Sequence, residues 1–252
     1  MLKCDCLKDV NFLNNNYYGL YSKGKSNVSW DSELDWSLAG NDVLPEYLKS
    51  IAIDVASMSA HVEILGMQNA AELLVKCSDF SLKIGLGQAV NDEARHAELF
   101  AKYALLANGR IRDFTKTKDI YDSHFDDLKT FDEVFLSHVF LENGALEQFN
   151  IFIYAFGEES LIGKIYRGAL QDEARHVQMG ILYFREKILR DDKYMFFLDE
   201  HLNKYSSLLK VNDKGIQWLS ELSKISELEL RNRINKRQSS FINKLIQVGS
   251  YV

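Results

Sequence analysis

The sequence predicts an all-α protein, and three observations support this prediction. A chain of 252 residues with 46% hydrophobic content is long enough to bury one well-filled core. It contains one proline, Pro45, and 14 glycines, so residues that break helices are rare. Long stretches also space their apolar residues so that they fall on one face of a helix. We therefore expect a single domain, residues 1–252, built from helices.

The N-terminal segment is predicted to differ from the rest of the chain. Residues 1–40 are rich in Asn, Ser and Gly and show poor helical periodicity, so we expect an irregular lead-in with short helices at most. It should wrap the bundle rather than build it. Helical periodicity begins after Asn41 and Asp42, which are plausible N-cap residues, and continues through Glu63 to about Cys77.

Three further helices complete a predicted four-helix core, residues 43–189. Gly109 and Gly157 mark two helix ends, because glycine readily adopts the left-handed conformation that ends helices. The charged, broken stretch 110–129 is expected to be a longer connection. Residues 190–252 should add extra helices, the last of them packing on the outside or against a partner subunit in a homodimer. The predicted helices after the first span residues 81–106, 131–156, 159–189, 194–209 and 215–246.

Composition excludes several classes of protein. The net charge of −6 argues against a nucleic-acid groove, and a short basic run near the C-terminus reads better as a solvated helix end. No apolar run reaches the ~20 residues of a membrane span. Three cysteines without scaffold spacing, and no apolar segment after Met1, favour a reducing cytoplasm. We interpret Cys4 and Cys6 as incidental rather than as a metal site. The basic residues are Arg231, Arg233, Lys236 and Arg237.

The most informative feature is the sequence Asp-Glu-Ala-Arg-His, which occurs twice, at residues 92–96 and 172–176. Each copy contains Glu-x-x-His, and residues three apart lie on one face of a helix. One carboxylate and one imidazole can therefore bind the same metal ion. The repeat predicts two equivalent half-sites, one with Glu93 and His96 and the other with Glu173 and His176.

A dimetal bundle also needs one carboxylate from each of the other two helices. Glu63 precedes Glu93 by 30 residues and Glu142 precedes Glu173 by 31, so each pair can face across one helical hairpin. Both repeated glutamates have apolar neighbours on their helix faces, and converging buried carboxylates need a cation, a proton or a basic partner. Four carboxylates and two imidazoles suit iron or manganese.

Two residues on the third predicted helix leave alternatives open. Glu147 is a rival to Glu142, although Glu142 has the more apolar neighbours and the matching spacing. His138, one turn before Glu142, is an additional ligand, a hydrogen-bond donor to a ligand or an ordinary histidine. Small residues around Glu63 indicate either a cavity for substrate or O2 or close helix packing. These small residues are Ala52, Ala56, Ser59, Gly66 and Ala70.

The remaining repeated residues, Asp92, Arg95, Asp172 and Arg175, are predicted to support the imidazoles. A metal-bound histidine usually donates its other N–H to a carboxylate or a carbonyl, which fixes its tautomer. We expect each Asp to orient the histidine of the opposite motif and each Arg to balance an Asp. Ordinary salt bridges on the helix surface are the alternative.

The double Asp-Glu-x-Arg-His motif resembles that of the ferritin-like di-iron carboxylate superfamily, and within it the bacterial hydrocarbon monooxygenases and related N-oxygenases. The resemblance covers roughly residues 45–189. It implies a ferritin-like four-helix bundle with additional C-terminal helices, two iron ions, with manganese or a mixed Mn/Fe pair as alternatives, and O2 as co-substrate. Electrons would come from a reductase, a ferredoxin or the substrate. The implied metal ligands are Glu63, Glu93, His96, Glu142, Glu173 and His176.

Several positions depart from individual members of that superfamily. Phe100 stands where the ribonucleotide reductase small subunit has its radical tyrosine, and Ala169 stands where arylamine N-oxygenases have an extra histidine. Three cysteines cannot supply a four-cysteine rubredoxin module. The resemblance implies an oxidase or oxygenase acting on a small organic molecule. A metal-handling ferroxidase or a peroxide-scavenging rubrerythrin- or bacterioferritin-like protein is the alternative, and a non-catalytic helical protein is a third.

Overall fold

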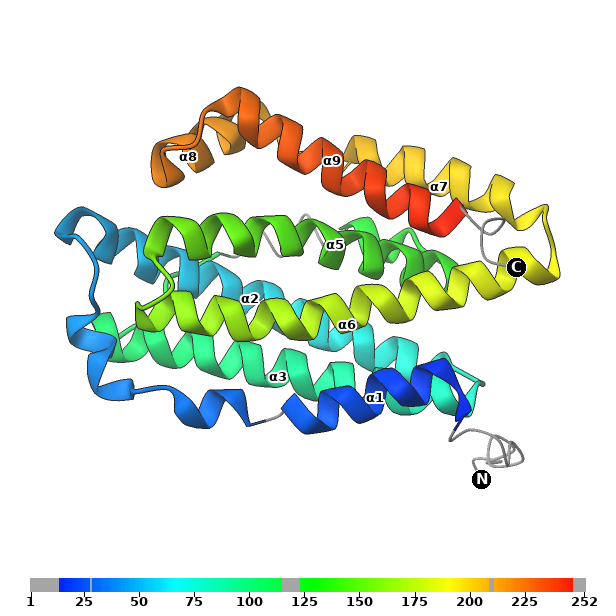
Figure 1. Cartoon of the computed structure of the whole chain (residues 1–252), viewed down its shortest axis with the longest axis horizontal. Helices are drawn as coiled ribbons and strands as arrows, with labels where there is room; N and C mark the ends of the chain where they lie inside the picture. The colour runs from blue at the N-terminus through cyan, green and yellow to red at the C-terminus, as the bar shows by residue number, and fades with distance from the viewer. Residues whose placement is uncertain (1–13, 28, 115–122, 209–210, 247–252) are drawn as a thin grey trace.

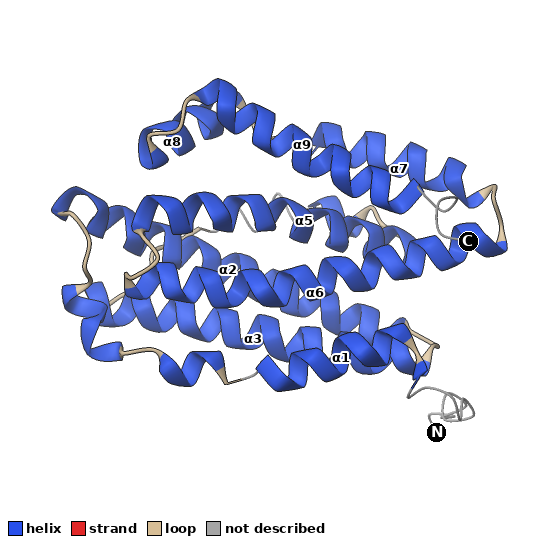
Figure 2. Ribbon diagram, viewed as in Figure 1, coloured by secondary structure: helices blue, strands red, loops and turns tan. Residues whose placement is uncertain are grey.

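The computed structural model describes residues 14–27, 29–114, 123–208 and 211–246, and these residues form helices joined by loops, without strands (Figure 2). The prediction of an all-α protein is confirmed for this part of the chain. Cys4 and Cys6 lie outside the described residues.

Four long helices form the centre of the molecule (Figure 1). They are α2 (Glu46–Lys76), α3 (Phe80–Asn108), α5 (Phe131–Phe156) and α6 (Leu161–Arg190). Helix α2 packs most extensively on α3, and α5 on α6, so the bundle consists of two hairpins that also contact each other through α3 with α6 and α2 with α5. Each hairpin thus brings one predicted Glu-x-x-His helix beside one single-glutamate helix.

The ends of these helices follow local chemistry. The side chain of Asp79 accepts from Leu82 N at the start of α3, and Ser160 does the same for Gly163 N at the start of α6. Gly109 ends α3 with a φ of 73°, a conformation that glycine adopts without the steric cost of a Cβ atom. The predicted helix 131–156 coincides with α5.

The prediction that Asn41 and Asp42 cap the first core helix is wrong. Helix α2 begins at Glu46, after Pro45, because the residue before a proline is disfavoured in the helical conformation. The Asp42 carboxylate instead accepts hydrogen bonds from the backbone N atoms of Leu161 and Ile162, at 2.7 and 3.2 Å. Asp42 therefore caps α6, a helix that begins 119 residues later.

The lead-in contains a three-turn helix, α1 (Asn16–Asn27), and two short 3-10 helices, η3 (Trp30–Glu33) and η4 (Trp36–Asn41). Helix α1 lies against α3 and α6, at the side of the bundle (Figure 1). The described part of this segment covers the bundle, as expected. Residues 1–13 lie outside the described part.

Within its described residues, the C-terminal region contains three helices, α7 (Tyr194–Leu208), α8 (Asp213–Ser223) and α9 (Glu227–Ile246). The prediction of one helix over 215–246 is wrong, because Lys224 adopts the left-handed conformation, with a φ of 61°. The hydroxyl of Ser220 donates to Ile225 O at 2.6 Å and stabilises the break. Helix α9 packs on α5 and α6.

Helix α2 is long and apolar enough to span a membrane by length and composition, and it is the one such helix among the described residues. Half of its most apolar window is buried inside the bundle. It also carries the buried carboxylate of Glu63. A core helix of a bundle has the same composition.

The first turn of α5 makes stability depend on pH. The Glu133 carboxylate accepts from the backbone N atoms of Thr130 and Lys129, at 2.7 and 3.0 Å. Although partial burial opposes the shift, these hydrogen bonds lower the pKa of Glu133 to about 2. Because the folded pKa is below the unfolded one, the stabilisation is present above the unfolded pKa and is lost as the pH falls towards the folded pKa.

We expect Glu133→Gln to lower the free energy of unfolding by about 1 kcal/mol near neutral pH and by clearly less at about pH 3. Urea unfolding at both pH values measures this difference. Glu200→Gln removes an exposed carboxylate from α7 and is the control. An equal loss at both pH values would contradict the assignment.

Candidate metal centre

One glutamate from each core helix points into the middle of the bundle: Glu63 from α2, Glu93 from α3, Glu142 from α5 and Glu173 from α6. Their exposed fractions are 5, 2, 6 and 2%. Burying an ionised carboxylate without compensation costs so much free energy that such groups are almost always paired, protonated or bound to a cation. Four together define a site that requires positive charge.

The four glutamates and two histidines form two overlapping groups whose potential ligand atoms lie within 4.8 Å of one another. Glu93 and Glu173 belong to both groups, and each group is completed by one further glutamate and one histidine. This is the arrangement in which two carboxylates lie between two metal positions. The first group is Glu63, Glu93, His96 and Glu173, and the second is Glu93, Glu142, Glu173 and His176.

Both imidazoles point their Nδ1 atoms at the carboxylates. His96 Nδ1 lies 3.2 Å from Glu173 Oε1 and 3.5 Å from Glu63 Oε2. His176 Nδ1 lies 3.2 Å from Glu142 Oε1 and 3.4 Å from Glu173 Oε2. Neither Nδ1 atom makes a well-aligned hydrogen bond within the described residues. Donor atoms bound at ~2.1 Å to one ion lie about 3.0–3.5 Å apart, so these separations fit shared ions.

The opposite ring nitrogen of each histidine contacts the aspartate of the other motif. His96 Nε2 lies 3.1 Å from Asp172 Oδ2, and His176 Nε2 lies 3.4 Å from Asp92 Oδ2. Donation from Nε2 to an aspartate leaves Nδ1 free to bind a metal. The crossed contacts expected from the repeat are therefore present.

The two arginines of the repeat join both aspartates. Arg95 Nη2 donates to Asp172 Oδ2 at 2.6 Å and to Asp92 Oδ1 at 2.9 Å. Arg175 Nη2 donates to Asp92 Oδ2 at 2.9 Å and to Asp172 Oδ1 at 2.5 Å. Two guanidinium groups thus balance two aspartates, all of them largely buried. The charge of the four glutamates is left for other cations to compensate.

In the metal-free site, the pKa shifts of the buried side chains also show that the carboxylates require positive charge nearby. Burial, together with the negative charges of Glu173 and Glu63, raises the pKa of Glu93 well above its usual value. Burial opposes ionisation of His96 and His176, but the surrounding carboxylates raise the pKa of both imidazoles. Without a metal the cluster therefore retains protons on these groups. Divalent ions would replace them, and the donor set fits such ions.

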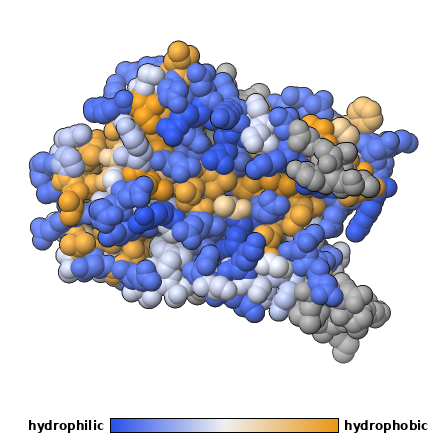
Figure 3. All heavy atoms as spheres, viewed as in Figure 1, coloured by the Kyte–Doolittle hydropathy of each residue, from blue (hydrophilic) through white to orange (hydrophobic). Residues whose placement is uncertain are grey.

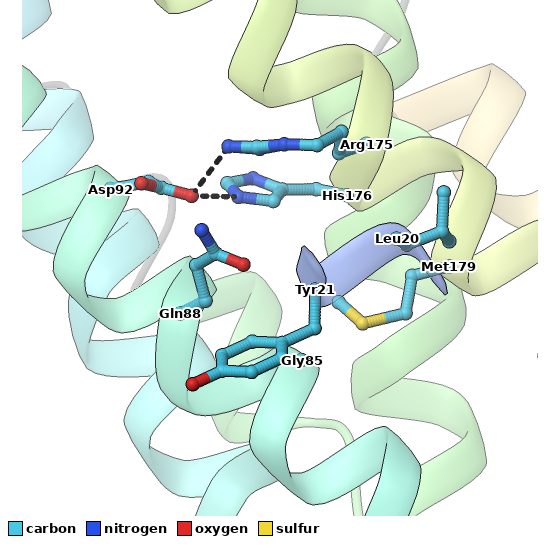
Figure 4. A pocket seen from close by; sticks show the side chains of 8 residues that line it. All are labelled: Leu20, Tyr21, Gly85, Gln88, Asp92, Arg175, His176 and Met179. Carbon is cyan, nitrogen blue, oxygen red and sulfur yellow. Dashed lines mark hydrogen bonds and ion pairs between the residues drawn. The ribbon is translucent and has the colours of Figure 1, made fainter. Parts of the chain in front are cut away.

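Helix α1 closes the outer side of the contact between His176 and Asp92. Figure 4 shows this contact beside Arg175, with Leu20 and Tyr21 of α1 across from it. The cavity here has a volume of about 10 Å³. That is room for one water molecule at most, so the N-terminal segment shields the ion-paired layer from solvent.

Comparison with known proteins gives a structural match only. No family model matches the chain, and no curated protein matches it. A variant of an R2-like ligand-binding oxidase with an aerobically reconstituted Mn/Fe cofactor is similar, with a TM-score of 0.72 and 17% identity over 92% of this chain and 94% of that chain. Another variant gives 0.71 and 18%, over 92% and 95%. The fold is ferritin-like.

Within this ferritin-like fold, Glu147, the rival to Glu142, lies outside both ligand groups. Its carboxylate lies 3.2 Å from Arg233 Nε and 3.6 Å from Arg237 Nη2, both on α9. The reason is angular, because five residues of helix rotate the side chain of Glu147 away from that of Glu142. Part of the basic run on α9 is therefore paired rather than simply solvated.

His138 lies outside both ligand groups but contacts one of their members. Its Nε2 atom is 2.9 Å from Glu142 Oε1, and its side chain is buried. Burial alone would raise the pKa of Glu142, but the neighbouring His138 and His176 together lower it. Of the alternatives left open, the structure favours His138 as a residue that supports a ligand carboxylate.

The small residues near Glu63 serve close packing. A Cβ atom at Gly66 would lie 3.0 Å from Glu93 Oε2, so the glycine makes room for the carboxylate of the neighbouring helix. Ser59 shares a 2.7 Å hydrogen bond with the buried hydroxyl of Tyr166. The alanines of this face, Ala52, Ala56 and Ala70, are fully buried.

Sequence reasoning missed Trp30. Its indole Nε1 donates to Asp172 Oδ2 at 3.0 Å, and its ring lies 5.3 Å from the guanidinium carbon of Arg95. A Cβ atom at Gly168 would come within 2.2 Å of the ring, so this glycine admits it. Gly168 lies one turn before Asp172 and could have indicated a close contact at this position. Nothing in the sequence of residues 1–40 identified Trp30 as the residue that makes this contact.

We expect Trp30→Phe to preserve the packing over Gly168 but to lower the free energy of unfolding by about 1 kcal/mol, because one hydrogen bond to a buried carboxylate is lost. Urea unfolding measures the change. Trp36→Phe is the matched control, since Trp36 lies against Lys102 instead. Equal losses in both variants would mean that the bond to Asp172 contributes nothing specific.

Proposed function

We propose that this protein is a non-haem dimetal oxidase or oxygenase that uses O2 to oxidise a small organic substrate. The observation that carries the proposal is the buried set of four carboxylates and two imidazoles, arranged as two overlapping ligand groups. The ferritin-like fold is shared with an oxidase whose structures contain an Mn/Fe cofactor. The repeated motif adds its similarity to the bacterial di-iron monooxygenases and N-oxygenases.

In this proposal Glu63 and His96 hold one ion, and Glu142 and His176 hold the other. Glu93 and Glu173, which belong to both groups, hold the ions together. Two redox-active ions bound there would supply the electrons that activate O2. Iron is the first choice for both positions, with manganese or a mixed pair as alternatives, because carboxylate and imidazole ligands accept each metal.

The surrounding side chains keep water from the centre. Phe100, Phe149 and Tyr166 form an aromatic cluster on one side, with the rings of Phe100 and Tyr166 4.7 Å apart. All three are at least 95% buried. In a site of such low polarity, charge on the metals interacts strongly with its ligands. The electrons for each turnover would come from a reductase, a ferredoxin or the substrate.

The metal assignment predicts different behaviour for two glutamates five residues apart. Glu142→Gln should weaken metal binding by at least about tenfold, because one ligand carboxylate is lost. Glu147→Gln should leave the stoichiometry at two ions per chain. Metal content after anaerobic Fe(II) loading and desalting measures both. If the two variants retained equal amounts of metal, the ligand groups would be wrong.

The function itself is tested by adding O2 to protein loaded with Fe(II). We expect the wild type to consume O2 with a transient optical absorption, and Glu173→Ala to lose both, because Glu173 belongs to both ligand groups. Excess Fe(II), supplied without an organic substrate, tests the alternative. Sustained catalytic oxidation of Fe(II) under those conditions would indicate a metal-handling ferroxidase rather than an oxygenase.

A further inference from the structure

A second cavity lies between the bundle and the C-terminal helix α9. Its volume is about 250 Å³, much larger than the cavity beside α1. Figure 1 shows α9 running alongside α5 and α6, and Figure 3 shows a band of apolar residues over those two helices. The lining residues are Asn143 and Leu146 of α5, Ala174, Val177, Gln178 and Ile181 of α6, and Arg237, Ser240, Phe241 and Lys244 of α9.

On each of the three helices, the residues that line the cavity lie on one face, as expected for a cavity formed where these helices pack. On α9 the lining residues follow one another by three, one and three positions, as a helical stripe requires. Leu146, Val177, Ile181 and Phe241 supply apolar walls. This apolar part of the wall suits a hydrocarbon or aromatic body, while polar atoms make up the larger share of the accessible lining.

Asn143, which also lines the cavity, adds a polar group. Its side chain is 97% buried, since its exposed fraction is 3%, and its Nδ2 atom has no hydrogen-bond partner within the described residues. An unsatisfied buried amide costs free energy, so such groups in folded proteins normally have a partner. Because Nδ2 donates, the missing partner is an acceptor, such as a carbonyl oxygen of a ligand.

The α9 side of the cavity is cationic. Arg237 and Lys244 line it, and Lys244 is exposed to solvent. The carboxylate of Glu147 lies near Arg237, but it is shared with Arg233. Arg233 and Arg237 thus share one carboxylate, and the positive charge left on the cavity wall favours an anion.

We propose that this cavity binds a small organic carboxylate, with its anionic end at Arg237 and Lys244, its apolar body against the walls and a hydrogen-bond acceptor at Asn143. The volume is below the ~300–1,000 Å³ of pockets for drug-sized molecules, so the ligand is short and compact rather than a long acyl chain.

The position of the cavity gives such a ligand a role. Asn143, Ala174 and Val177 are the immediate chain neighbours of Glu142, Glu173 and His176. The cavity therefore borders the helical turns that carry the second ligand group. That the bound carboxylate is the substrate class rests on the proposed oxidase function, whereas its binding does not depend on that function.

The test uses 4-acetylbenzoate, which has a carboxylate, an aromatic body and a ketone acceptor at the far end. Titration calorimetry on the full-length chain, both metal-free and loaded with Mn(II), measures its affinity without any O2 chemistry. Two matched ligands separate the contacts. 4-Isopropylbenzoate lacks the acceptor, and 4-acetylbenzamide lacks the negative charge.

We expect 4-acetylbenzoate to bind more tightly than either matched ligand, with similar affinity in the metal-free and loaded protein. Replacing Arg237 and Lys244 together by glutamine should weaken its binding about tenfold. Asn143→Leu should weaken the binding of 4-acetylbenzoate by a similar factor but leave the affinity for 4-isopropylbenzoate unchanged. Lys236→Gln, which removes an exposed charge from the same helix outside the cavity, is the control and should change nothing.

Three results would overturn the proposal. The first is that 4-acetylbenzoate does not bind, and the second is that it binds no more tightly than 4-acetylbenzamide. The third is that it binds only to the metal-loaded protein, with an affinity that the substitutions on α9 do not change. The last result would place the carboxylate on the metal ions instead. If the protein bound 4-acetylbenzoate but did not consume O2, the oxidase function would be rejected and the binding site would stand. Unfolding curves of each variant show whether it is folded.

Discussion

Four carboxylates form two overlapping groups in the middle of the bundle, each carboxylate more than 90% buried, and their charge is the constraint on which the rest of the structure depends. The two arginines nearby do not relieve it, because they are already balanced by Asp92 and Asp172. Protons partly neutralise the metal-free cluster. A pair of divalent ions compensates four negative charges completely, and the histidine Nδ1 atoms are oriented towards the place where those ions would lie.

Around this centre lie successive shells of side chains, and each shell fixes the orientation of the side chains inside it. The aspartates orient the imidazoles, and the arginines hold the aspartates. Trp30 and helix α1 cover this ion-paired layer on one side. On the other side His138 contacts Glu142, and α9 covers α5 and α6. The segments before and after the four-helix core therefore contribute to the environment of the candidate centre.

The sequence predicted those features that depend on neighbours along one helix. Glu-x-x-His spacing, apolar periodicity and the glycines at 109 and 157 are local signals, and they predicted the core helices and the side chains that converge in the candidate centre. Contacts between distant segments were predicted where the repeat indicated them, as for the crossed Asp–His contacts, and others were missed or misassigned. Asp42 caps a helix far along the chain, Trp30 meets Asp172 across 142 positions, and Glu147 turns towards arginines of α9. No spacing within one helix encodes such contacts.

The crossing of the two motifs has a consequence for the chain as a whole. Each imidazole is oriented by an aspartate from the other hairpin, and Glu93 and Glu173 serve both groups. One hairpin alone would hold a histidine without its aspartate partner and only two of the three carboxylates of a ligand group. The smallest unit that can assemble either half of the centre is therefore two hairpins together, whether joined in one chain or brought together from two identical copies. The second arrangement would be symmetric, and the five-residue repeat retains that symmetry within a single polypeptide.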